Sequence, residues 1–158
     1  MKMPALLSSS RKPCARTRTL LKDLTRLLPQ SAIANRGKMS VEDLAETARG
    51  AGLNRVIIVC DSHGNPGEIR FVRVEEDEWS WLARLKVRSV KLAREYDEPS
   101  MPRADALSIE DGKIADLFGI EPEESGFELR SQGGVLSFWR DDAEIGPRLK
   151  VEELPDEA

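Results

Sequence analysis

The hydrophobic positions of this chain change their period from one segment to the next, and each period predicts an element. Leucines recur at positions 20, 21, 24, 27 and 28, which is the spacing of a helix that buries one face. Pro29 should end this helix, because proline lacks a backbone donor and clashes with the preceding turn. The pattern therefore predicts an amphipathic helix over residues 15–28.

Two shorter helices are predicted from their end signals. Ser40 and Asp43 stand three residues apart, as in a capping box in which Asp replaces the usual Glu. We therefore expect a helix over residues 41–49, with glycines soon after it. A third helix is expected over residues 110–118, because Gly119 follows directly and favours a helix end.

The remaining ordered segments have the composition or alternation of strands. Residues 55–60 are β-branched and apolar, as in a strand that is buried on both faces. The turn at 63–67 and the Gly133-Gly134 pair each separate two such segments, which indicates two hairpins. Strands are predicted over residues 31–34, 55–60, 68–74, 79–93, 127–131, 135–140 and 147–152. Irregular mixing of helices and strands favours an α/β fold with a mixed sheet.

The length and the apolar runs limit the class of protein. The chain has 158 residues, which suits one domain with its own core, and we predict a single domain over 1–158. Residues 1–10 are expected to be a frayed tail, and residues 153–158 an acidic tail. The longest apolar run, Val56–Cys60, is too short to span a membrane. Pro4–Leu7 is too short for a signal-peptide core, so we expect a cytoplasmic protein.

The charge of the chain is divided unequally between its two parts. The formal net charge is −4, but residues 1–96 carry 18 basic and 11 acidic side chains, whereas residues 97–158 carry 6 and 17. Such asymmetry suggests a polyanionic partner for the basic part. The alternative is a drift of composition without functional consequence.

The basic residues are densest between Arg11 and Lys38, where eight of them accompany one acid. On the predicted first helix, Arg18, Lys22 and Arg26 lie opposite the leucines. Like charges four residues apart destabilise a helix by a few tenths of a kcal/mol, so an external anion would compensate them. A solvated face that is paired with acids from elsewhere in the fold is the alternative.

A second candidate contact is the loop Asn35-Arg36-Gly37-Lys38. Its glycine allows close approach of the backbone, and its side chains can donate to phosphate or to base edges. No Ser or Thr follows the lysine, which excludes a P-loop. An ordinary turn before a capped helix is the alternative. Arg84, Lys86 and Arg88 could extend the basic surface, but a solvated outer sheet face is the preferred explanation for them.

Residues for catalysis are not arranged in a recognisable pattern. Asp61, Ser62 and His63 are hydrolase residue types, but they are adjacent in sequence, whereas catalytic triads are assembled in space. Cys14 and Cys60 stand far apart and belong to no CxxC pair, so we expect neither a metal site nor a disulfide. We therefore predict no catalytic residues and no cofactor.

Several short strings together resemble the Brix-domain family of ribosome-biogenesis factors, in its short archaeal branch. They are Ser9-Ser10-Arg11-Lys12-Pro13, Arg16-Thr17-Arg18, Lys22-Asp23-Leu24, Asn35-Arg36-Gly37-Lys38, Arg55-Val56-Ile57-Ile58-Val59 and Gly64-Asn65-Pro66-Gly67. The resemblance covers residues 8–74 and is closest to the branch that acts in small-subunit processing. It implies a non-enzymatic rRNA-binding factor, built as two similar α/β halves like the anticodon-binding domain of class II aminoacyl-tRNA synthetases.

The sequence thus predicts a monomeric RNA-binding factor that binds precursor rRNA and assists its folding or processing in ribosomal subunit biogenesis. The expected RNA-binding residues are Arg11, Lys12, Arg16, Arg18, Lys22, Arg26, Asn35, Arg36, Gly37 and Lys38. Ribosomal or pre-ribosomal proteins are further possible partners. The main alternative is a protein-interaction scaffold that docks basic ribosomal proteins through its acidic second half. A metal-dependent nuclease is a weaker alternative, because the acids are scattered.

Overall fold

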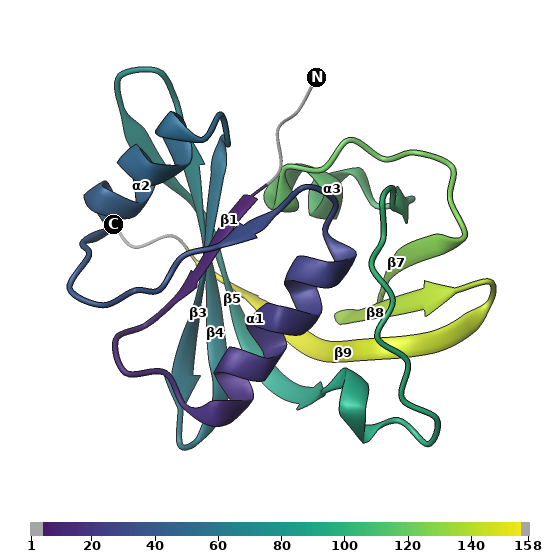
Figure 1. The fold of residues 1–158 in the computed structure, drawn as a ribbon. Coiled ribbons are helices and arrows are strands. Elements are labelled where there is room, and N and C mark those ends of the chain that lie inside the picture. Colours follow the sequence, from purple (N-terminus) through teal and green to yellow (C-terminus); the bar gives the residue numbers. More distant parts are fainter. Residues whose placement is uncertain (1–4, 156–158) are drawn as a thin grey trace.

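The computed structural model describes residues 5–155 as an α/β fold with one mixed sheet (Figure 1). The strands are β1 (Ala5–Ser9), β2 (Ala32–Ile33), β3 (Arg55–Ser62), β4 (Asn65–Val74), β5 (Trp79–Lys91), β6 (Ser108–Ile109), β7 (Phe127–Gln132), β8 (Val135–Arg140) and β9 (Ala143–Leu154). The helices are α1 (Ala15–Leu27), α2 (Val41–Gly50), α3 (Gly112–Phe118) and the 3-10 turn η1 (Ala93–Glu95). None of the helices within residues 5–155 is long and apolar enough to cross a membrane.

The sheet is built from two halves that repeat one topology. Its strand order is β2-β1-β3-β4-β5-β9-β8-β7-β6. In the first half, β1 is parallel to β3, which continues antiparallel through β4 to β5. In the second half, β6 is parallel to β7, which continues antiparallel through β8 to β9. Antiparallel pairing of β5 with β9 joins the halves. This arrangement confirms the predicted α/β class and its two similar halves.

The two hairpins repeat as well, down to their turns. His63 and Gly64 join β3 to β4, and both residues have positive φ angles of 51° and 78°. Gly133 and Gly134 occupy the same place between β7 and β8, with φ angles of 59° and 79°. Two consecutive positive φ angles are typical of the type I′ turn that suits two-residue hairpins. The predicted 63–67 turn is therefore shorter than expected, because Asn65–Gly67 already belong to β4.

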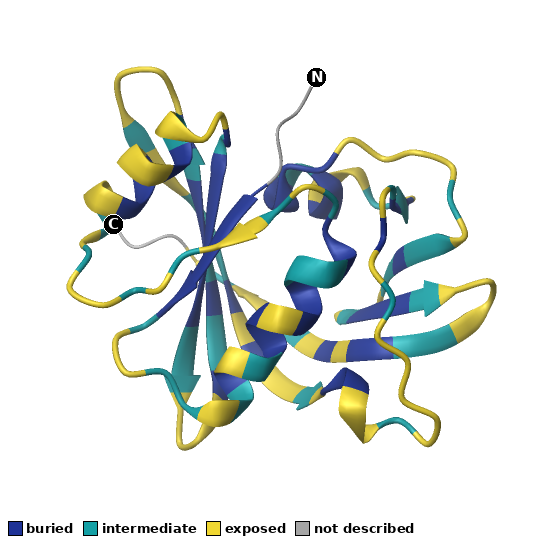
Figure 2. Cartoon of the chain, viewed as in Figure 1, coloured by how far each residue is buried: buried dark blue, intermediate teal, exposed yellow. Residues whose placement is uncertain are grey.

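The helices cover the two faces of the sheet unequally. Helices α1 and α3 pack on one face and share a core with strands of both halves, whereas α2 covers the opposite face of the first half only (Figure 1). The leucines of α1 all point into this shared core, as their spacing predicted. In Figure 2, exposed positions alternate with buried ones along α1, while β1 is buried throughout. Arg18 and Lys22 therefore lie on the outer side of α1, whereas Arg16 and Arg26 are half-buried.

Most of the predicted elements are confirmed. Helix α1 ends one residue before its predicted end, and α2 begins with the expected capping box, in which Asp43 N–H donates to Ser40 Oγ (3.1 Å) and Ser40 N–H donates to Asp43 Oδ2 (2.9 Å). The long segment that begins at Trp79 is indeed one strand. The two-residue strand β6 was not predicted, because it is too short to show a period.

The expected frayed tail at residues 1–10 is wrong for the part that the structure describes. Ala5–Ser9 form β1, which is wholly buried and lies between β2 and β3. The serines suggested a loop, yet inside the sheet they are satisfied by hydrogen bonds: Ser8 Oγ donates to the Ala34 carbonyl (2.8 Å). Residues 1–4 lie outside the described part of the chain.

The expected acidic tail also begins too early. Glu153 and Leu154 belong to β9, where they pair with Leu85 and Arg84 of β5. This strand begins at Ala143, earlier than predicted, because it runs along both β8 and β5 and so extends beyond its apolar centre. Residues 156–158 lie outside the described part of the chain.

Candidate nucleic-acid interface

The predicted Asn35–Lys38 loop and the loop that carries Arg11 and Lys12 meet at one edge of the sheet. Strands β1, β2 and β3 are parallel, so the loops that follow them emerge at the same edge. The connection from β1 runs through α1 on one face, and the connection into β3 runs through α2 on the other face. Diverging connections of this kind create the crevice at the carboxyl ends of strands where open α/β sheets bind ligands.

Arg36 holds the two loops together. Its Nη1 donates to the Ser9 carbonyl (3.0 Å), and its Nε donates to the Met39 carbonyl (2.7 Å). Burial lowers the pKa of Arg36 from its ordinary value, and the neighbouring cations Arg11 and Arg70 lower it further. Arg36 is therefore a structural tie between the Asn35–Lys38 loop and β1, and Arg11 lies close to it.

The amino end of α1 is capped by a carboxylate from a distant strand. Asp61, at the end of β3, accepts hydrogen bonds from Cys14 N–H (2.7 Å) and Thr17 Oγ1 (2.5 Å). A carboxylate here is favoured by the unsatisfied N–H groups and the positive end of the helix dipole. Asp61 thus serves as a helix cap, and His63 lies in the hairpin turn. The anion position at this helix end is taken by the protein itself.

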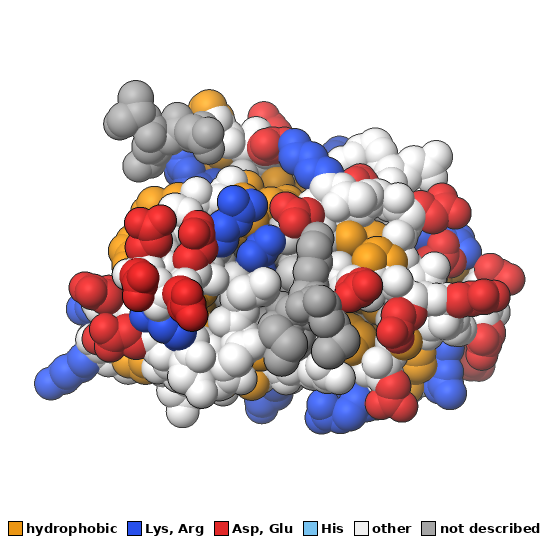
Figure 3. Space-filling view, turned by 90° about the horizontal axis from the view of Figure 1, so that it is seen from above, with side chains coloured by type: hydrophobic (Ala, Val, Ile, Leu, Met, Phe, Trp, Pro, Cys, Tyr) orange, Lys and Arg blue, Asp and Glu red, His pale blue; other side chains and the backbone are white. Residues whose placement is uncertain are grey.

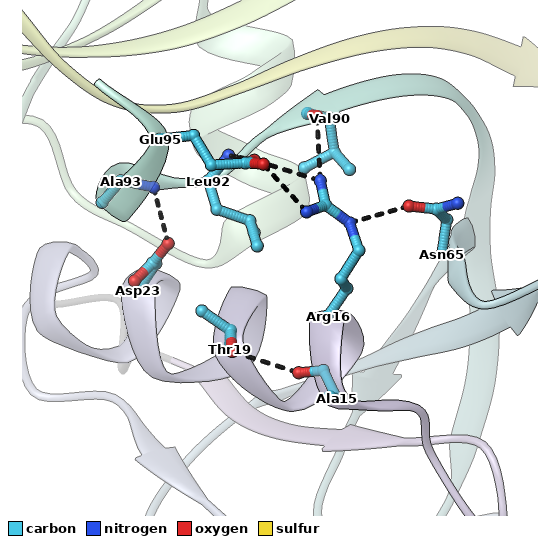
Figure 4. A network of polar contacts seen from close by, with 9 residues as sticks. All are labelled: Ala15, Arg16, Thr19, Asp23, Asn65, Val90, Leu92, Ala93 and Glu95. Carbon is cyan, nitrogen blue, oxygen red and sulfur yellow. Dashed lines mark hydrogen bonds and ion pairs between the residues drawn. The ribbon is translucent and has the colours of Figure 1, made fainter. Parts of the chain in front are cut away.

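Arg16 connects α1 to three other elements (Figure 4). Its Nε donates to Asn65 Oδ1 (2.7 Å), and its Nη2 donates to the Val90 carbonyl (3.3 Å). Both terminal nitrogens also reach the Glu95 carboxylate at 3.0 and 3.1 Å. This hydrogen bonding lowers the pKa of Glu95 below its ordinary value. The predicted RNA contact Arg16 is thus bound within the fold, where it fastens α1 to β4, β5 and η1.

Arg26 is also bound within the fold. Its Nη2 lies 2.7 Å from Oδ1 of Asp23, whose side chain is only 1% exposed. The second oxygen of Asp23 accepts Ala93 N–H at 3.0 Å, a contact also drawn in Figure 4. Asp23 was the single acid on the predicted helix, and its burial was not foreseen. The expected uncompensated row therefore loses Arg26, whose charge is compensated inside the structure.

Five predicted cations remain exposed. Arg18 donates only to the Pro13 carbonyl (2.5 Å), which places it beside the loop before α1. Within residues 5–155, none of the five forms an ion pair with an acidic side chain. Asn35 and Gly37 are exposed next to them. We call these five cations the basic surface: Arg11, Lys12, Arg18, Lys22 and Lys38.

The basic strand β5 belongs to a mixed-charge sheet face. Arg88 forms an ion pair with Glu152 of β9, and Arg84 lies 3.8 Å from Glu68 of β4. The alternative of an outer sheet face with its own partners therefore describes these arginines better than a free cationic row. Lys86 is exposed and lies opposite Glu68 on β4 and Glu152 on β9. Both of these acids pair with arginines.

Acidic side chains gather at the opposite end of the molecule. The β4–β5 turn, Glu75–Glu78, is exposed and lies at the amino end of β3, away from the basic surface. Figure 3 views this end and shows red side chains over α2 and the turn at the left, and again at the right over the second half. The molecule is therefore electrostatically polar, with one basic edge.

The fold and the basic surface together define an α/β protein of two similar halves with one cationic edge, which is suited to a polyanionic ligand. No protein-family model matches the chain. A probable Brix domain-containing ribosomal biogenesis protein of Pyrococcus abyssi is 37% identical over 90 residues, which cover 57% of this chain and 40% of that protein. The chain thus spans less than half the length of that relative.

A protein of the same description from Aeropyrum pernix matches over almost its whole length. It is 30% identical over 167 residues, which cover 92% of this chain and 93% of that protein. The crystal structure of a probable ribosomal biogenesis protein from Aeropyrum pernix superimposes with a TM-score of 0.78 at 29% identity and covers 98% of both chains. The chain belongs to the family of Brix domain-containing ribosomal biogenesis proteins.

Proposed function

We propose that this chain binds precursor rRNA through the basic surface and assists the folding or processing of that RNA during ribosomal subunit biogenesis. It would act in the cytoplasm as a monomeric, single-domain and non-catalytic factor. The observation that supports this proposal most is the set of five exposed cations of the basic surface, which form no ion pairs with acids among residues 5–155. Membership of the family supports the biogenesis role.

The predicted RNA-binding residues would divide into two roles. The basic surface would contact phosphates, because each neutralised phosphate releases condensed counterions and so increases affinity. Asn35 and Gly37 would let the second loop approach the RNA backbone or base edges closely. Arg16, Arg26 and Arg36 would hold the loops and α1 in place, since each guanidinium already donates to another group of the fold. Preference for RNA over DNA would arise from helix shape and the 2′-hydroxyl.

A salt titration of binding to a small-subunit rRNA fragment tests the proposal. The variant Arg18→Ala/Lys22→Ala/Lys38→Ala removes three exposed charges. Arg26 is left unchanged, because its loss would leave buried Asp23 without its ion-pair partner. The slope of log K against log salt should fall by about two to three units, since each phosphate contact contributes roughly 0.9. The control Lys113→Ala/Arg130→Ala/Arg140→Ala makes the same charge change in the second half and should leave the slope nearly unchanged.

A duplex DNA of equal length serves as the reference ligand. Tighter binding of RNA than of this DNA, together with a slope change confined to the first-half variant, would support the proposal. Equal and weak binding of both nucleic acids, unaffected by either variant, would contradict it. The remaining hypothesis would then be a scaffold that docks basic ribosomal proteins through its acidic second half.

A further inference from the structure

Strands β4 and β5 separate toward the basic edge of the sheet. They pair along their length as far as Glu68 and Lys86. Beyond that point, Asn65 and Pro66 pair only with β3, and the last residues of β5, Ser89–Lys91, pair only with β9. The separation leaves a gap in the sheet between two strand segments that both belong to the first half.

The gap is a groove of about 410 Å³, within the range of roughly 300–1,000 Å³ that is typical of small-molecule sites. One wall comes from the β3–β4 hairpin and the other from β5. Its lining residues are Ser62, Asn65, Pro66, Gly67, Lys86, Val87, Arg88, Ser89 and Val90. The hairpin wall is closely packed, since a Cβ on Gly67 would lie 2.3 Å from the Cβ of Ser62. The volume of the groove is enough for one nucleotide, whereas a duplex is far too wide to enter it.

The lining chemistry suits an anion with polar attachments. No acidic side chain is among the lining residues, whereas Lys86 and Arg88 are cations. The nearest acids are engaged: Glu68 pairs with Arg70 at 2.5 Å, and Glu152 pairs with Arg88. Lys86 is left exposed, with no ion pair among the described residues. A phosphodiester would therefore find one free ammonium group in the groove.

Arg16 joins the two walls of this groove. Its guanidinium donates to Asn65 on one wall and to the Val90 carbonyl on the other, so it spans both walls (Figure 4). Because Asn65 Oδ1 accepts this hydrogen bond, the amide nitrogen of Asn65 points away from Arg16 and can donate to a ligand. Asn65 begins β4 beside the end of β3, and Ser89 lies near the end of β5, so both lie at the same edge of the sheet as the basic loops. An RNA strand on the basic surface could therefore continue into the groove.

We propose that the groove between β4 and β5 binds a single unpaired nucleotide of the RNA. Lys86 would contact its phosphate, and the Asn65 amide and the Ser89 hydroxyl would contact its sugar or base. This inference rests on the proposed function, because the nucleotide belongs to the same RNA strand. It adds a requirement that the bound RNA be single-stranded at one position next to the basic surface.

Amide chemical shifts measured during titration with the single-stranded oligonucleotide hexauridylate test the proposal. In the wild-type chain, the amides of Asn65, Gly67 and Ser89 should shift together with those of Lys12 and Lys38. The variant Ser89→Trp fills the groove and should abolish the groove shifts while the shifts at Lys12 and Lys38 persist. Lys86→Ala should weaken binding by about fivefold and reduce the salt slope by roughly 0.7, the value for one contact to a single strand.

The control is Lys113→Ala, which removes an exposed lysine of the second half that pairs with Glu153 and should leave hexauridylate binding unchanged. Shifts at Lys12 and Lys38 without any at the groove would overturn the nucleotide site and leave the proposed function intact. Shifts at neither place, combined with no binding of the rRNA fragment, would overturn both. Equal weakening by Lys86→Ala and Lys113→Ala would reduce the groove to a general charge effect and so contradict the proposal.

Discussion

The two halves of this molecule share a topology but carry opposite charges at corresponding places. The loop after β1 presents Arg11 and Lys12, whereas the loop after β6 presents Glu110 and Asp111. The second edge forms a groove of about 330 Å³ whose lining includes these acids and Glu128. The topology of each half depends on its buried apolar residues. Exposed charges can differ between the halves without altering that topology. The same scaffold therefore presents one cationic edge and one anionic edge.

The two halves also cap corresponding helices in different ways. Asp111 caps α3 from the adjacent position, accepting Lys113 N–H at 3.0 Å and Ile114 N–H at 3.2 Å. Helix α1 has no cap of its own and takes Asp61 from β3, 47 positions away. A remote cap fastens the β1–α1 loop to the end of β3. The basic edge is thus held by tertiary contacts, whereas the acidic edge is held by local ones.

The largest expected effect tests whether the halves fold as one unit. Phe71 of β4 and Phe118 of α3 are fully buried and meet edge to face at 5.2 Å between ring centroids. Phe118→Ala should reduce the free energy of unfolding by about 3–5 kcal/mol, because it removes apolar contacts and leaves a cavity. Urea unfolding should still show one transition in which both halves lose structure. Two separate transitions, or a cost no larger than that of Phe118→Leu, would contradict a shared core.

The next prediction gives the first half the charges of the second. Arg11→Glu combined with Lys12→Asp should weaken binding to the rRNA fragment by about 100-fold near physiological salt, because two phosphate contacts become repulsive. Stability should change by less than about 0.5 kcal/mol, since both residues are exposed. Arg140→Glu with Lys113→Asp makes the same charge change in the second half. If that control weakened binding equally, the charge asymmetry of the halves would not determine the binding edge.

A smaller effect on stability should distinguish the Asp61 cap of α1 from the Asp111 cap of α3. Asp61→Ala should reduce the free energy of unfolding by about 1–2 kcal/mol and Asp111→Ala by about 1 kcal/mol, the usual range for lost caps. Only the Asp61 variant should also increase amide hydrogen exchange in the β1–α1 loop, because that carboxylate joins the loop to β3. Unchanged exchange in this loop would show that its position does not depend on Asp61.

The smallest effect concerns pH and the Arg16 contact. Arg16 lowers the pKa of Glu95 below its ordinary value of 4.5, so the stabilisation is present above that pH and is lost as pH falls through the lower folded-state pKa. The wild-type chain should therefore be more stable than Glu95→Gln at pH 6, and the difference should shrink toward pH 3. Urea unfolding at several pH values measures it. A difference that stays constant with pH would mean that the contact is not ionic.

The sequence by itself determined the elements whose signals are local. The leucine spacing predicted α1 to within one residue, the Ser40–Asp43 pair predicted the capping box of α2, and Gly133-Gly134 predicted the second hairpin. The concentration of basic residues between Arg11 and Lys38 indicated which part of the chain carries the exposed cations. These signals act between residues a few positions apart, where periodicity and turn chemistry suffice.

Only the tertiary structure decided which of the basic residues are exposed and which are held. Arg16 meets Glu95, 79 positions away, and buried Asp23 meets the backbone of Ala93, 70 positions away, while it pairs with Arg26. Burial of β1 likewise depends on its neighbours β2 and β3. The charge of a side chain is known from the sequence, but its partner depends on which distant strands and helices pack beside it. Folding therefore converted one basic cluster into three structural ties and five exposed cations.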